Sequence, residues 1–100
     1  MADIKLFTLN TTQELIGKFV TDEGNAFIVE DVLWVRPVQT GPNEYGLQMD
    51  PFSLSNPDGK IRIYKNAIVS ESVNVPEGLQ AAYTRQTSNI EIVSSIPGMM

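Results

Sequence analysis

A long run of β-type residues, 26–38, restricts the possible folds of this chain more than any other feature. It begins with alternating apolar and polar residues and becomes apolar on both faces at residues 32–35. A strand buried on both faces fits a small barrel in which it crosses from one layer of the sheet to the other. We therefore expect a long central strand in a curved β-sheet.

Five further β-prone runs surround this strand, and turn-forming residues separate them. The runs cover residues 4–9, 14–20, 45–49, 60–64 and 68–73. Gly17 lacks a Cβ and allows a sharp bend in the second run. Gly24 and Asn25 tolerate positive φ and favour a chain reversal after Asp22. Residues 39–44 predict a loop, and Pro51 predicts a bulge, an edge or a bend.

The sequence changes character at Pro76, where a helix is predicted to begin. Leu79, Ala82 and Tyr83 fall on one face at helical spacing. Asn89 is predicted to end this helix, and residues 90–93 predict a short strand or an ordered tail. We therefore divide the chain into a β domain, 1–75, and a C-terminal extension, 76–100, that is accessory to the β domain.

The composition fits one small globular domain, since 42% of the 100 residues are hydrophobic and 19% are charged. A core of this size is limited, so assembly into an oligomer would stabilise it. The chain contains no cysteine and no histidine. Disulfides, thiolate metal sites and histidine general bases are therefore excluded, and we expect a protein that is not an enzyme and has no cofactor and no bound metal.

The net charge of -5 argues against general binding to phosphate backbones, because such binding depends on Lys and Arg. We therefore expect no double-stranded DNA partner, and any contact with nucleic acid must be local. The N-terminus lacks the basic and apolar stretches of a signal peptide, and no apolar run approaches the length of a membrane span. These features predict a soluble cytoplasmic protein with no membrane partner.

Two segments carry a resemblance to a known family. In the first, a hydrophobic-x-Gly strand around Gly17 leads through a turn containing Asp22 into a long strand that reaches Glu30-Asp31. The second reads Tyr-Lys-Asn-Ala-Ile at residues 64–68. Together they resemble the paired motifs of Sm-like proteins. The second is most similar to the Tyr-Lys-His-Ala-Ile signature of the bacterial Hfq branch, and the layout over residues 4–73 is similar to that of phage-encoded members.

The resemblance implies a small, strongly bent, five-stranded antiparallel barrel with a C-terminal helical extension. It also implies a homomeric ring of five to seven subunits that binds single-stranded RNA, U-rich sequences included, in the host cytoplasm. The residues that match the RNA-binding positions are Asp22, Asn25, Tyr64, Lys65 and Asn66. An amide can read a base edge, and a lysine can contact a phosphate.

The chain departs from the family pattern at two positions. Ala26 stands where the first motif has its asparagine, with Asn25 one place early, and Asn66 replaces the bacterial histidine. The matching residues therefore also have purely structural interpretations that do not involve RNA. Asp22 alone can form an Asx turn, Lys65 with Asn66 can form a plain polar turn, and Tyr64 can be a rim residue. The alternative function is a scaffolding ring without RNA.

Overall fold

The computed structural model describes the backbone of residues 3–95 and the side chains of residues 3–88. Within these residues the chain forms six strands, a short 3-10 turn and a helix. They are β1 (Asp3–Leu9), β2 (Glu14–Asp22), β3 (Ala26–Gly41), β4 (Glu44–Pro51), β5 (Lys60–Tyr64), η1 (Lys65–Ala67), β6 (Ile68–Glu71) and α1 (Glu77–Ser95). Each predicted β run forms a strand, so a mainly β fold with a C-terminal helix is confirmed.

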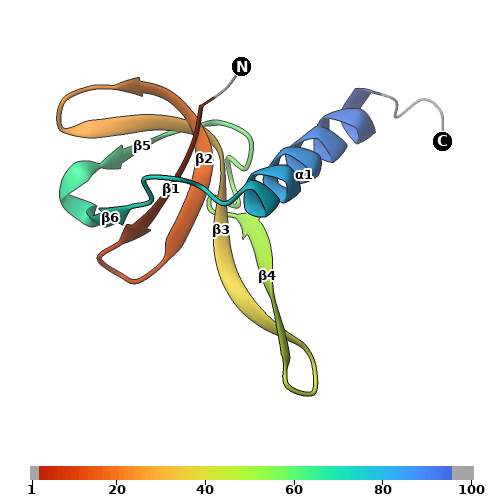
Figure 1. Ribbon diagram of the computed structural model, residues 1–100. Coiled ribbons are helices and arrows are strands. Elements are labelled where there is room, and N and C mark those ends of the chain that lie inside the picture. Colours follow the sequence, from red (N-terminus) through yellow and green to blue (C-terminus); the bar gives the residue numbers. More distant parts are fainter. Residues whose placement is uncertain (1–2, 96–100) are drawn as a thin grey trace.

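All strand pairings are antiparallel, and the strand order is β4-β3-β2-β1-β6, with β5 also paired to β3. The length of β3 allows two partners, because residues 26–30 pair with β5 and residues 33–41 pair with β4. The sheet is strongly curled, as expected, but it does not close, and the β3–β4 hairpin projects from it as an arm (Figure 1).

The bend in the sheet is located at Gly17. Ile16 pairs with Leu33 and Lys18 pairs with Glu30, so two residues of β3 lie opposite this single glycine. Asp31, one of the two, has a positive φ of 52°. A Cβ on Gly17 would lie 3.3 Å from Cγ2 of Val32, which is a tight contact. The bulge increases the local twist and bends β3, and the glycine leaves room for that bend.

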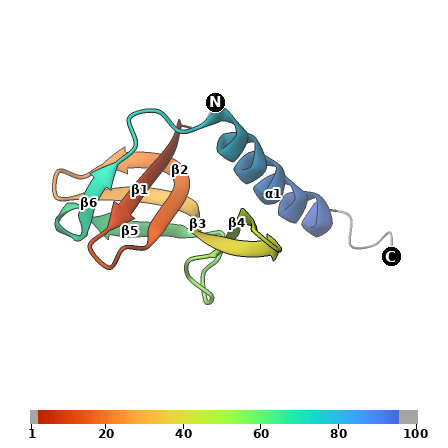
Figure 2. The same cartoon turned by 60° about the horizontal axis from the view of Figure 1, so that its bottom comes forward.

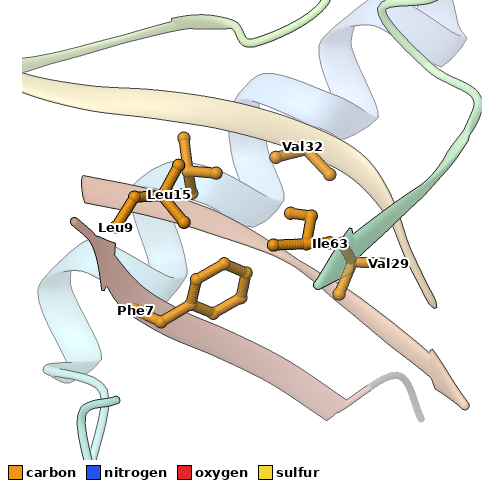
Figure 3. Packing of buried hydrophobic residues seen from close by; sticks show 6 residues of the cluster. All are labelled: Phe7, Leu9, Leu15, Val29, Val32 and Ile63. Atoms are coloured by element: carbon orange, nitrogen blue, oxygen red, sulfur yellow. The ribbon is translucent and has the colours of Figure 1, made fainter. Parts of the chain in front are cut away.

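The inner cluster of buried residues lies within the curl of the sheet (Figure 3). Its members come from β1, β2, β3 and β5 and are Phe7, Leu9, Leu15, Val29, Val32 and Ile63. Trp34 is partly buried and packs against them. The alternation of β3 then directs Leu33 and Val35 to the other face of the sheet.

That other face carries the outer cluster, which consists of Leu6, Ile16, Leu33, Val35 and Tyr83. Tyr83 comes from α1, which lies beside the sheet (Figure 2), and its side chain is fully buried. The predicted helical face is correct, because Leu79 also packs against this cluster. The helix is also joined to β4, since the Gln86 side-chain amide donates a hydrogen bond to the Met49 carbonyl at 2.8 Å. Both faces of β3 are therefore covered.

Two local predictions are wrong. The predicted loop at residues 39–44 is a tight hairpin, because β3 continues to Gly41 and β4 begins at Glu44. Only Pro42 and Asn43 connect the strands, and Asn43 has the positive φ, 61°, that such a turn requires.

The second error concerns residues 90–93, which are neither a strand nor a tail. They belong to α1, which continues past Asn89 to Ser95. Asparagine at this position therefore does not stop the helix. In the described part of the chain, no helix is both long and apolar enough to cross a membrane.

Candidate functional site

The two segments that carry the family resemblance meet at one end of the sheet. The β2–β3 turn and the β5–η1 junction lie side by side there (Figures 1 and 2). β5 pairs with the start of β3, which places Tyr64 opposite Ala26. The next residue, Lys65, donates its backbone N–H to the carbonyl of Asn25 at 2.9 Å. Strand pairing therefore brings Asn25 and Lys65 together although they are far apart in the sequence.

We call the region where the β2–β3 turn meets the β5–η1 junction the corner. Two interactions hold the ammonium group of Lys65 there. Its Nζ lies 2.9 Å from Oδ1 and 3.0 Å from Oδ2 of Asp22. The same nitrogen lies 4.8 Å from the centre of the Phe27 ring, within the range of a cation–π interaction. Lys65 is therefore positioned by the structure, and its side chain remains about one-third exposed at 37%.

Asp22 organises the β2–β3 turn as well as Lys65. Its Oδ1 accepts a hydrogen bond from the Gly24 N–H at 2.8 Å, which forms an Asx turn. Gly24 has a φ of 94°, so the predicted glycine reversal is correct. The hydrogen bond from Lys65, followed by that from Gly24, lowers the pKa of Asp22 below its ordinary value of 3.8. The structural role predicted for Asp22 is thus present, together with a lysine contact.

The remaining predicted site residues are exposed. Asn25 precedes β3, Tyr64 ends β5, and Asn66 lies within η1. The Tyr64 side chain is accessible, since the residue is 51% exposed. This corner therefore presents an ammonium, two amides and a phenol, a set that can contact phosphates and base edges.

The structure adds neighbours that sequence reasoning missed. Arg62 donates hydrogen bonds to both carboxylate oxygens of Glu23, at 2.7 and 3.3 Å. The Arg62 hydrogen bond lowers the pKa of Glu23. Lys5 of β1 lies 2.8 Å from a carboxylate oxygen of Glu71 in β6. In the sequence, only the alternation of β1 indicates that Lys5 faces the same side of the sheet as the core residue Phe7, because the two residues are two positions apart.

The charges of this corner and of the residues beside it balance one another. The three cations Lys5, Arg62 and Lys65 each pair with a carboxylate. Over the described residues, no group of three or more Asp or Glu side chains is arranged to hold a metal ion. The corner is thus a set of exposed ion pairs, which rearrange at low cost because exposed pairs add little to stability.

The sequence matches no protein family model, and it matches no curated protein significantly. The Sm-like resemblance therefore depends on the motif residues themselves, and the function inferred from it is a proposal.

Proposed function

We propose that this protein binds single-stranded RNA at the corner formed by Asp22, Asn25, Tyr64, Lys65 and Asn66. The observation that carries this proposal is the meeting of the two motif segments through the Lys65–Asn25 backbone hydrogen bond. One ammonium and two exposed amides are thereby gathered at one end of the sheet. Single-stranded RNA leaves its base edges and phosphates open to such groups.

The amides and the lysine have different roles in this proposal. Lys65 contacts a phosphate, whereas Asn25 and Asn66 contact base edges, because an amide both donates and accepts hydrogen bonds. Tyr64, which is half exposed, supplies a hydroxyl and an aromatic ring. The protein acts without catalysis or a cofactor, in the cytoplasm. With a net charge of -5, its affinity comes from local contacts.

A homo-oligomeric ring of five to seven subunits is part of the proposal. β4 and β5 each pair only with β3, and β6 pairs only with β1, so each retains a free edge among the described strands. The edges proposed for the ring are those at the two ends of the strand order, β4 and β6. Exposed apolar residues lie on both edges, Tyr45 and Leu47 on β4 and Val69 on β6. Free edges of this kind pair with other chains, and a head-to-tail contact forms a ring when its rotation closes.

In a closed ring, the β4 edge and the β6 edge of every subunit are paired with neighbouring subunits. Native mass spectrometry at micromolar protein concentration should therefore show one closed oligomer. A monomeric mass alone would contradict the assembly, and a ladder of increasing sizes would indicate an open chain of subunits.

A second candidate function is a scaffolding ring that binds no RNA. The observation that favours it is the pairing of each cation at or beside the corner with a carboxylate of the same chain. Such pairing leaves no net positive charge to attract a phosphate backbone. The ring would then serve assembly alone, through the same strand edges.

Fluorescence anisotropy separates the two functions. Labelled oligo-U, oligo-A and single-stranded DNA are titrated with the protein at two salt concentrations. Saturable binding of RNA that weakens at the higher salt supports the first function. An absence of saturable binding by every oligonucleotide at the lower salt supports the scaffold.

A further inference from the structure

Two lysines from distant parts of the chain share one aromatic ring. Nζ of Lys65 lies 4.8 Å from the centre of the Phe27 ring, and Nζ of Lys5 lies 5.2 Å from the same centre. Lys5 also lies 5.0 Å from the centre of the Phe19 ring. We name these four residues the lysine–phenylalanine cluster. It places a second ammonium beside the corner already described.

Each lysine of the cluster is bound by one carboxylate. Asp22 holds Lys65 at 2.9 Å, and Glu71 holds Lys5 at 2.8 Å. The two pairs are close enough to influence each other. The pKa of Asp22 is lowered chiefly by Lys65 and the Gly24 N–H, with a smaller contribution from the charge of Lys5. Lys5 therefore lies close enough to the Asp22–Lys65 pair to contribute to the field at its carboxylate.

A carboxylate and a phosphate offer an ammonium the same kind of partner, an anionic oxygen that accepts a hydrogen bond. The two carboxylates are accessible to solvent, with 47% of the Asp22 side chain and 39% of the Glu71 side chain exposed. An exposed ion pair is weak, so a phosphate can replace the carboxylate. Removal of the carboxylate charge would also relieve its repulsion of an incoming phosphate.

The aromatic rings add a second reason to place a nucleotide here. Phe19 and Phe27 are partly exposed and meet edge to face, with ring centres 6.0 Å apart. The Phe27 ring lies near both ammonium groups, and the Phe19 ring lies near that of Lys5. An aromatic ring beside a row of cations is the arrangement that single-stranded nucleic acids use for stacking and backbone contact.

We propose that Lys5 and Lys65 contact adjacent phosphates of one bound RNA strand, and that Glu71 and Asp22 compete with those phosphates for the lysines. This inference rests on the proposed RNA-binding function and extends its site from the corner to β1. The free protein is then autoinhibited, because a carboxylate of the same chain occupies each position that a phosphate would take. RNA binding exchanges both ion pairs together.

The inference predicts opposite effects for the two members of each ion pair. Lys5→Ala and Lys65→Ala should each weaken oligo-U binding severalfold and lower the salt slope by about 0.7 for each phosphate that the variant no longer neutralises. Glu71→Gln and Asp22→Asn should each tighten binding severalfold, because they free the lysine. Lys18→Ala is the matched control, since Lys18 forms an ion pair of the same kind with Asp31 at 3.0 Å but lies outside the cluster.

The experiment is an anisotropy titration of labelled oligo-U at two salt concentrations with wild type and these five variants. Circular dichroism and elution volume first establish that each variant folds and assembles as wild type does. Inorganic phosphate in a separate arm tests whether the free ion competes at millimolar concentration. Efficient competition would show that the lysines select a single phosphate rather than a strand, and would overturn the adjacent-phosphate assignment.

The remaining outcomes distinguish a failure of this inference from a failure of the proposed RNA-binding function. If wild type binds oligo-U and Lys5→Ala behaves as Lys18→Ala does, the RNA function stands and the extension to Lys5 is wrong. If Glu71→Gln and Asp22→Asn weaken binding, the carboxylates position the lysines and do not compete with RNA. If wild type and both carboxylate variants all fail to bind at low salt, the RNA function and this inference are both wrong.

Discussion

The hydroxyl of Tyr83 donates a hydrogen bond to the backbone carbonyl of Asp31 at 2.6 Å. This contact joins α1 to the bulge of β3, at the residue whose positive φ marks the bend. Burial, followed by the nearby charges of Asp31 and Glu30, raises the pKa of Tyr83 far above its ordinary value, so the hydroxyl remains a donor. The helix thereby stabilises the curvature of the sheet.

Tyr83→Phe should lower the free energy of unfolding by about 1–3 kcal/mol, because the Asp31 carbonyl loses its buried donor. Urea denaturation measures the change. Tyr45→Phe is the control, since Tyr45 is 72% exposed and should leave stability unchanged. Equal midpoints for the two variants would show that the hydrogen bond adds nothing to stability.

Gly17→Ala should destabilise the protein by about 1–3 kcal/mol, because its new Cβ crowds Val32 at the bend. Gly78→Ala is the opposite case. Nothing lies within 4 Å of a Cβ at Gly78, in the first turn of α1, so alanine there should stabilise by about 0.5–1 kcal/mol. Thermal unfolding of the two variants should move the midpoint in opposite directions. A midpoint for Gly17→Ala that is unchanged or raised would refute the steric argument at Gly17.

Truncation after Val75 tests whether α1 is accessory to the β domain. The inner cluster contains no residue of α1, so the truncated protein should still unfold cooperatively. Its stability should be lower by about 3–5 kcal/mol, the cost of losing a buried aromatic residue from the outer cluster. Calorimetry and elution volume provide the measurements. A truncated protein without any cooperative transition would show that the helix is required for the fold.

Acid should destabilise the protein through three carboxylates. Lys65 lowers the pKa of Asp22, Arg62 lowers that of Glu23, and Gln48 followed by Arg36 lowers that of Asp50. Their contribution to stability is therefore complete above the ordinary values, 3.8 for Asp and 4.5 for Glu, and is lost as the pH falls through the lowered values. The temperature of the unfolding midpoint should thus decrease as the pH is lowered from about 5 through the lowered pKa values of these three groups.

The combined variant Asp22→Asn, Glu23→Gln, Asp50→Asn should show a weaker dependence of the midpoint on pH over this range. Asp58→Asn is the control, because Asp58 is an exposed aspartate that forms no ion pair with any residue the structure describes. An unchanged pH dependence in the combined variant would assign the acid sensitivity to other groups.

Substitutions at the RNA site should distinguish residues that contact phosphates from residues that contact base edges. Asn66→Ala should change the preference between oligo-U and oligo-A and leave the salt slope unaltered, because an amide carries no charge. Lys65→Ala should weaken binding to all sequences and reduce the salt slope. Tyr64→Phe separates a hydroxyl contact from ring packing. Tight binding that is insensitive to Lys65→Ala would place the RNA site on another face of the protein.

The sequence predicted the features that depend on neighbouring residues. Runs of β-prone residues between turn residues located each strand, Gly17 marked the bend, and Gly24 marked the reversal after Asp22. The start of α1 after Pro76 and its buried face also follow from local spacing. The two local errors concern element ends, at the tight turn of Pro42 with Asn43 and past Asn89, where pairing and helix continuation overrode the preferences of single residues.

Local pattern in the sequence alone therefore predicted the β-strands, the bend at Gly17, the start of the helix and the turn residues at the corner, whereas the strongly bent antiparallel arrangement was implied by the Sm-like resemblance. Only the tertiary structure decided how the charges pair, since Lys5 and Glu71 are 66 positions apart and Lys65 and Asp22 are 43 apart. It also decided that α1 contacts the β3 bulge through Tyr83. The physical reason is that exposed ion pairs and a single buried hydroxyl leave no periodic pattern in the sequence, because their partners are selected by strand pairing and by the bend.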